Sequence, residues 1–192
     1  MLASMVSCGK KQNSDIDDSK SEAVINTEFD KAAEVISSKP DEFIAYLNQR
    51  GFKKVSESIE EGEVEYIFTT DFEKVEIEGT MDGNNVHVYN ISIQRRETSL
   101  EQAKSLYKTL HTKLNDKYKY DYDSNVLKTH YNTPEKHIEA VGALNESQVG
   151  ENPFIVGAHE YAGNSSETCG ASVTLSKQDN VYKIVLYVGV GG

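Results

Sequence analysis

One amphipathic helix, flanked on both sides by strand-like segments, most constrains the fold of this chain. The stretch 98–115 (TSLEQAKSLYKTLHTKLN) opens on Thr98, whose hydroxyl can accept an unpaired backbone N–H, and Glu101 can complete a capping box. Five apolar residues then recur at helical spacing on one face: Ala103, Leu106, Tyr107, Leu110 and Leu114. Such a stripe must be buried against another element, and the two-residue periodicity of the flanking segments makes a sheet the expected partner.

Alternating apolar and polar residues predict strands before and after this helix. The segments with this pattern are 63–68, 75–78, 86–94, 118–123, 154–162, 170–177 and 181–190. The turns 82–85 (DGNN) and 178–180 (QDN) contain residues that tolerate positive φ, which predicts two hairpins. The pattern of 86–94 changes phase between Val88 and Tyr89, so this segment either contains a bulge or is partly buried on both faces.

Three further helices complete the predicted order of elements. They cover 28–37, a segment from Pro40 to the helix-ending Gly51, and a segment that starts at Thr133-Pro134. The expected fold class is α+β, an antiparallel β-sheet with helices packed on one face. The last strand is apolar on both faces, so we expect it in the centre of the sheet. Each half ends in a hairpin, so the order also allows two αβββ pseudo-repeats, 28–97 and 98–192.

The charge of the chain limits its partners. The 192 residues carry a formal net charge of −11, which argues against nonspecific nucleic-acid binding because that requires Lys and Arg to neutralise phosphates. Between Glu57 and Glu78 there are nine acidic residues and one Lys. This segment is either the solvated face of amphipathic strands or a surface for a basic partner or cations. No apolar run of 18 residues occurs, so no transmembrane helix is expected.

The residues Met5, Val6, Ser7 and Cys8 resemble the lipobox at the end of a bacterial lipoprotein signal peptide. The resemblance implies that 1–8 is a truncated signal-like segment and that Cys8 is the lipid attachment site. The protein would then be anchored by its N-terminal lipid to a membrane of the bacterial cell envelope. The polar segment 9–27 is expected to be a disordered tether, and 28–192 the folded domain. Seven residues are too few for a complete signal peptide, so either the numbering starts at an internal Met or the match is accidental.

Motifs of metal sites are missing from the sequence. The five histidines (His87, His111, His130, His137 and His159) form no H-E-x-x-H pair. Asp121, Asp123 and Asn125 begin like an EF-hand loop, but Val126 stands at the invariant glycine position and Asn132 at the position of the bidentate glutamate. We therefore expect no metal site and no cofactor.

Neither nucleophilic residues nor aromatic residues single out one activity. Cys169 follows Glu167, whose charge disfavours a reactive thiolate, so no catalytic residue is assigned. Tyr118, Tyr120 and Tyr122 alternate along one predicted strand and are the candidate partner surface, although tyrosine equally suits a half-buried strand. The leading hypothesis is a non-enzymatic domain that binds a ligand or an envelope protein, as an inhibitor or immunity protein would. The alternatives are an envelope hydrolase acting through carboxylates and an accessory subunit of an envelope assembly.

Overall fold

The computed structural model describes residues 18–36, 39–117, 119–122, 133–150, 154–161 and 168–191. Its helices are α1 (Asp18–Val35), α2 (Asp41–Gln49), α3 (Leu100–Lys117) and α4 (Pro134–Gly142). Its strands are β1 (Lys53–Glu60), β2 (Glu63–Thr69), β3 (Glu73–Asp82), β4 (Asn85–Glu97), β5 (Lys119–Tyr122), β6 (Phe154–Tyr161), β7 (Thr168–Gln178) and β8 (Val181–Gly191).

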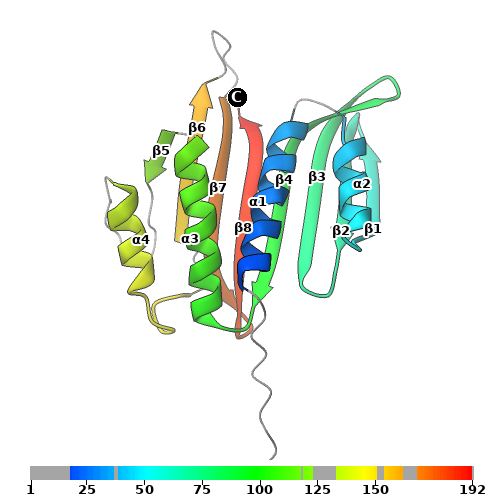
Figure 1. The fold of residues 1–192 in the computed structure, drawn as a ribbon. Helices are drawn as coiled ribbons and strands as arrows, with labels where there is room; N and C mark the ends of the chain where they lie inside the picture. Colours follow the sequence, from blue (N-terminus) through cyan, green and yellow to red (C-terminus); the bar gives the residue numbers. More distant parts are fainter. Residues whose placement is uncertain are drawn as a thin grey trace, which may run out of the picture.

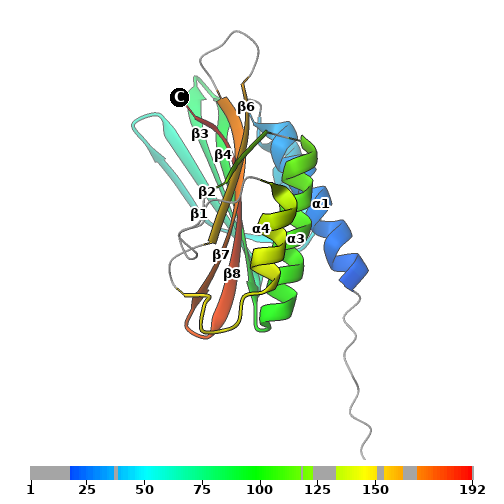
Figure 2. The same ribbon diagram turned by 90° about the vertical axis from the view of Figure 1, so that its left-hand side faces the viewer.

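The strands form one antiparallel sheet in the order β1-β2-β3-β4-β8-β7-β6-β5. All four described helices lie on one face of this sheet, and none of them lies on the other (Figures 1 and 2). The predicted α+β fold with helices on one face is thereby confirmed. β8 lies between β4 and β7, the central place expected for a strand that is apolar on both faces.

The strand order is symmetrical about the contact between β4 and β8, and each half supplies four consecutive strands. This is one strand more than the αβββ unit of the sequence prediction. In the first half the additional strand is β1, which is exposed along nearly its whole length and therefore lacks an apolar alternation. Glu61 and Gly62 both have positive φ, and this tight turn pairs β1 with β2.

The central helix α3 follows the sequence prediction closely. It begins at Leu100, and the Ala103 N–H donates to the Ser99 carbonyl at 3.1 Å, so Ser99 instead of Thr98 occupies the N-cap position. The five residues of the predicted apolar stripe are all buried, with Leu106 the most exposed at 6%. α3 packs against β7, β8 and α4, which confirms that the stripe is buried against a sheet.

Helix α1 corrects the predicted boundary of the tether. The helix begins at Asp18, so residues 18–27 are helical and do not belong to a disordered segment. Its apolar residues Phe29, Ala32 and Val35 lie in the core at helical spacing. Residues 1–17, including the lipobox-like segment, lie outside the described residues. Within the described parts of the chain, no helix is both long enough and apolar enough to cross a membrane.

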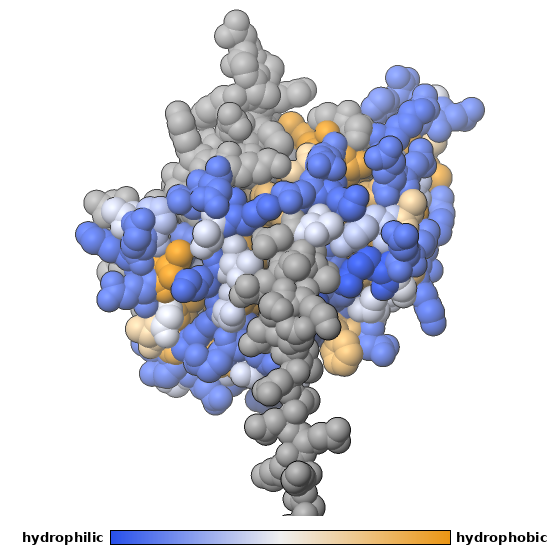
Figure 3. Space-filling view, in the orientation of Figure 1, coloured by the Kyte–Doolittle hydropathy of each residue, from blue (hydrophilic) through white to orange (hydrophobic). Residues whose placement is uncertain are grey.

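Two helix ends have the local signals that the sequence indicated. After α2, the Phe52 N–H donates to the Leu47 carbonyl at 3.0 Å and Gly51 has a φ of +87°, which is the geometry of a Schellman motif. At the start of α4, the Thr133 hydroxyl accepts from the Lys136 N–H at 3.4 Å, with Pro134 in the first turn. The outer surface of the helix layer is mostly hydrophilic wherever it is coloured in Figure 3, because the apolar stripes face the sheet.

Candidate functional site

The sheet face opposite the helices, called the open face below, is the candidate functional surface. In β2 and β3 the residues Val64, Phe68, Val75 and Ile77 are buried against the helix layer. Successive side chains of a strand point to opposite faces, so the residues between them lie on the open face. The hairpin of β1 and β2 leans away from the helices at its tip, toward the side of the open face (Figure 2).

Five carboxylates gather at one end of the open face, and together they are called the acidic cluster: Glu60, Glu63, Glu65, Glu76 and Glu78. The strand register places Glu60 opposite Glu63 and Glu65 opposite Glu78. Like charges directly opposite each other destabilise a strand pair, so a cation that binds between them relieves repulsion. The 19 residues from Glu60 to Glu78 thus place five carboxylates on one surface.

The other end of the open face is basic. Lys74 borders the acidic cluster, where it pairs with Glu76, and at the far end Arg96 lies opposite Lys183 in the pairing of β4 with β8. The charges therefore separate along the strand direction. The acidic end can attract a cationic group and the basic end repels it, so this face can orient a charged partner.

Asn90 connects β4 to the acidic cluster. It lies at a β-bulge, where the register between β3 and β4 shifts after Glu78 and Tyr89 is the additional residue. Asn90 is only 6% exposed, and its Nδ2 donates to Glu78 Oε2. Its Oδ1 accepts no hydrogen bond from the described residues. A buried acceptor without a donor costs free energy, so this oxygen is a place where a ligand with N–H groups gains affinity.

Two tyrosines border the acidic cluster. Burial raises the pKa of the Tyr89 phenol, and the carboxylates of Glu63 and Glu78 raise it further. Burial likewise raises the pKa of the Tyr187 phenol, with an added contribution from Glu78. Both phenols therefore lie within the field of the Glu78 carboxylate. Tyr187 is 44% exposed, so one of its ring faces is available to a partner.

Gly189 lies where Tyr187, Tyr89 and Asn90 come together. A Cβ atom at this position would lie 3.1 Å from Tyr187 Cε1, 3.2 Å from the Tyr89 carbonyl oxygen and 3.3 Å from Asn90 Oδ1. β8 places this glycine directly opposite Asn90. The Tyr187 ring edge and two oxygen acceptors therefore already fill the space over Gly189, and a side chain at this position would crowd them.

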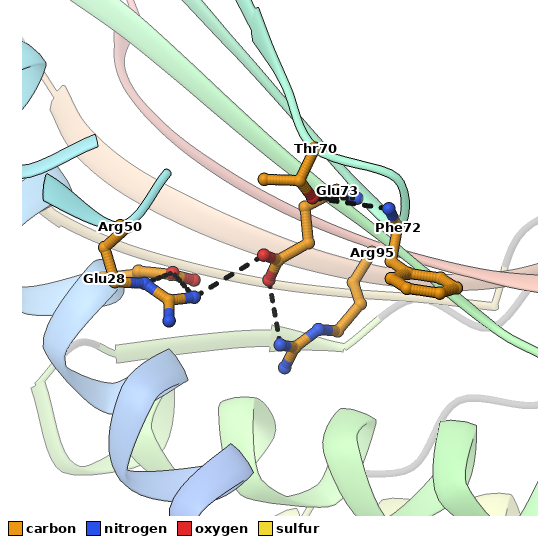
Figure 4. Close-up of polar contacts among 6 residues, drawn as sticks. All are labelled: Glu28, Arg50, Thr70, Phe72, Glu73 and Arg95. Carbon is orange, nitrogen blue, oxygen red and sulfur yellow. Dashed lines mark hydrogen bonds and ion pairs between the residues drawn. The ribbon is translucent and has the colours of Figure 1, made fainter. Parts of the chain in front are cut away.

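A second polar cluster lies beneath the helices, between α1, α2 and the sheet (Figure 4). Arg50 Nη2 lies 2.9 Å from Glu28 Oε1 and 3.5 Å from Glu73 Oε2, and Arg95 Nη2 lies 2.9 Å from Glu73 Oε1. The Thr70 hydroxyl accepts from the Glu73 N–H at 3.0 Å and holds the start of β3. Two carboxylates and two guanidinium groups balance each other. This network therefore fixes the helices on the sheet and offers no excess charge to a ligand.

Burial has a large effect on the pKa of Glu28. It raises the pKa of this carboxyl to about 7, the Glu73 charge raises it further, and Arg50 and Arg95 act in the opposite direction. A cavity of about 20 Å³ adjoins the network, enough for about one water molecule.

Two histidines that the sequence left unassigned stack between α3 and α4. The rings of His111 and His137 have centroids 5.0 Å apart and an interplanar angle of 16°, and both residues are fully buried. Burial lowers the pKa of His137 to about 4, and burial together with His137 lowers that of His111 to about 3. Two neutral rings at neutral pH serve as packing. Among the described residues, no group of three His, Cys, Asp or Glu side chains could hold a metal ion.

A groove of about 430 Å³ lies between α1 and α2. Its lining combines Lys31 and Lys39 with Glu34, Asp41 and Glu42. Both signs of charge alternate around it, so it selects neither an anion nor a cation. The open face has the clearer preference.

The sequence-predicted site residues lie elsewhere. Cys8 and Tyr118 are outside the described residues, and the backbone of Tyr120 and Tyr122 lies in the edge strand β5, opposite Ala158 and Val156. Cys169 lies in β7, and Asp121 in β5.

The residues that the sequence prediction did not select are Tyr89, Asn90 and Tyr187. The change of phase at Val88 and Tyr89 was the available signal, since it marked the bulge that places Asn90 beside Glu78. Comparisons with known protein families, with curated proteins and with solved structures found no match for this chain.

Proposed function

We propose that this protein is a lipid-anchored binding domain of the bacterial cell envelope that recognises a basic partner protein with its open face. It captures the partner and performs no chemistry on it, in the manner of an inhibitor or immunity protein. The observation that carries the proposal is the acidic cluster, which lies on the sheet face away from the described helices and beside the exposed ring of Tyr187.

Three features support recognition of a basic protein. The acidic cluster supplies long-range attraction and fast association. Tyr89 and Tyr187 supply flat apolar area with a hydroxyl, which is common at protein interfaces. The lipobox-like sequence before Cys8 supports an anchor in the envelope.

Charge reversal on the open face tests the binding function. The 192-residue chain and two double variants are immobilised and exposed to envelope extract at low salt. Glu65→Lys with Glu78→Lys reverses the acidic cluster. Glu139→Lys with Glu146→Lys makes the same change in net charge at exposed positions of α4 and the segment after it.

A stoichiometric basic protein that is retained by the parent chain and by the control pair, but not by the Glu65/Glu78 pair, supports the proposal. Release of the protein at about 0.5 M salt is also expected, because exposed charges are screened at that ionic strength. Equal retention by all three proteins refutes the proposed surface. Turnover of an ester or glycoside substrate by the purified protein would favour the hydrolase alternative.

The anchor needs a separate test. In the full precursor, Cys8→Ser removes the thiol of the lipobox-like segment, so the protein is expected to move from the membrane fraction to the soluble fraction. Cys169→Ser is the matched control and should leave the distribution unchanged. Membrane retention of the Cys8→Ser protein would contradict lipidation without affecting the proposed open face.

A further inference from the structure

Resting on the proposed function, we infer that Glu78, Tyr89, Asn90 and Tyr187 form a socket for one arginine side chain of the basic partner, which opens when the Tyr187 ring turns outward. These four residues are called the arginine socket below. The socket differs from the rest of the acidic cluster because it combines a charge with a directed, unused acceptor and a ring. It therefore selects arginine over lysine, whereas the cluster alone selects only positive charge.

Asn90 is buried, and beside Glu78 it keeps a hydrogen-bond acceptor that no described residue uses. Its side chain is 94% buried, since 6% of its surface is exposed, and its amide nitrogen is committed to Glu78. The amide oxygen lies beside the space over Gly189 that the Tyr187 ring fills, and it accepts no hydrogen bond from the described residues. A guanidinium placed there can donate to Asn90 Oδ1 and to the Glu78 carboxylate at the same time, because its N–H groups form a rigid planar fork.

The ring of Tyr187 favours arginine over lysine. A guanidinium plane stacks on an aromatic face, whereas the compact, strongly hydrated ammonium of lysine does not. Tyr187 Cε1 and Asn90 Oδ1 approach the same point over Gly189, at 3.1 and 3.3 Å from an added Cβ. The Tyr187 ring and Asn90 Oδ1 can thus contact the same guanidinium group.

Opening of the socket requires only a side-chain movement. Tyr187 covers Gly189 in this structure, but 44% of its surface is exposed, so its ring can rotate outward within nanoseconds. The backbone around Gly189 pairs with both β4 and β7 and stays in place. The bound guanidinium then lies between the ring and the strand.

Two peptides of equal charge test the arginine socket. They are acetylated, amidated heptapeptides in which three arginines or three lysines alternate with serine. Each is titrated into the ¹⁵N-labelled 192-residue chain at about 50 mM salt, where exposed charges still interact over more than 10 Å. Two quantities are recorded: the Kd and the shift of the Asn90 side-chain amide signal.

We expect the arginine peptide to bind about tenfold more tightly, the lower end of the range for one additional charge-assisted hydrogen bond. The Asn90 amide signal should shift more with the arginine peptide than with the lysine peptide. Asn90→Ala should reduce the preference to less than about twofold while lysine binding persists. The control variant Gln94→Ala should keep the preference for arginine, because Gln94 lies on the same strand and face but away from the socket.

Each outcome is decisive. Equal Kd values for the two peptides, or an Asn90 signal that does not move, overturn the arginine socket. If peptide binding is nevertheless lost when Glu65 and Glu78 are reversed, the proposed function stands without the arginine socket. If neither peptide binds, both the arginine socket and the proposed function are overturned. The Asn90 signal is measured on the unmodified chain, so the test remains valid even if Asn90→Ala does not fold.

Discussion

The Glu28 carboxylate, only 2% exposed, accepts hydrogen bonds from Arg50 Nε at 3.3 Å and from Nη2 at 2.9 Å. This contact joins α1 to the end of α2 above the start of β3 (Figure 4). Because α1 follows the N-terminal segment directly, Glu28 connects that segment to the folded body. Its pKa of about 7 makes the contact sensitive to pH in the neutral range.

Glu28 should make the protein less stable as pH rises. Its folded pKa of about 7 lies above the ordinary 4.5, so its contribution is complete below pH 4.5 and is lost as pH rises through 7. The change amounts to about 3 kcal/mol, since one pKa unit is worth about 1.4 kcal/mol. Urea unfolding at pH 5, 6, 7 and 8 measures it against Glu28→Gln. As pH rises, the free energy of unfolding of the parent chain should fall by this amount relative to that of Glu28→Gln. A difference that stays constant with pH would contradict the shifted pKa.

The stacked histidines should act in the opposite direction. Their folded pKa values, about 3 for His111 and about 4 for His137, lie below the ordinary 6.5, so stability is lost as pH falls below 6.5. Between pH 7 and pH 5 each ring should cost about 2 kcal/mol. His137→Gln should therefore lose about 2 kcal/mol less over this interval than the parent chain. The exposed His87 is the control, and His87→Gln should follow the parent curve.

Removal of Arg95 should destabilise the buried network. Glu73, whose side chain is 9% exposed, would keep only the longer contact to Arg50, and an unbalanced buried charge costs about 3 kcal/mol. Lys113→Ala breaks the more exposed pair with Asp30 and should cost less than about 1 kcal/mol. Chemical unfolding of both variants compares these losses. Combining Arg95→Met with Glu73→Leu should restore most of the stability, and a larger loss in the double variant would show that charge balance is not the cause.

Gly79 should tolerate no side chain. An added Cβ would lie 2.7 Å from the His87 carbonyl oxygen and 2.8 Å from Val86 Cγ1, so the backbone beside the bulge must shift. We expect Gly79→Ala to lower the free energy of unfolding by about 1–3 kcal/mol, as for overpacked sites. Gly150→Ala meets no atom within 4 Å and should change it little. Thermal unfolding of the two alanine variants gives the comparison, and equal melting temperatures would refute the crowding.

The elements were predictable where their signals are local. The apolar stripe of α3, the positive-φ turn at Asp179 and Asn180, and the glycine that ends α2 each depend on residues a few positions apart. The predictions were less accurate where packing decides. Strand β1 has no apolar alternation because it is an edge strand, and α1 extends to Asp18 through a segment whose composition suggested disorder.

The sequence by itself determined the α+β class, the central place of β8 and the concentration of acid between Glu57 and Glu78, because periodicity and charge are properties of neighbouring residues. Only the tertiary structure decided that Asn90 and Tyr187 meet over Gly189, and that Glu28 meets Arg50. The strand register and the packing of helices on the sheet set these contacts, and they join residues far apart along the chain.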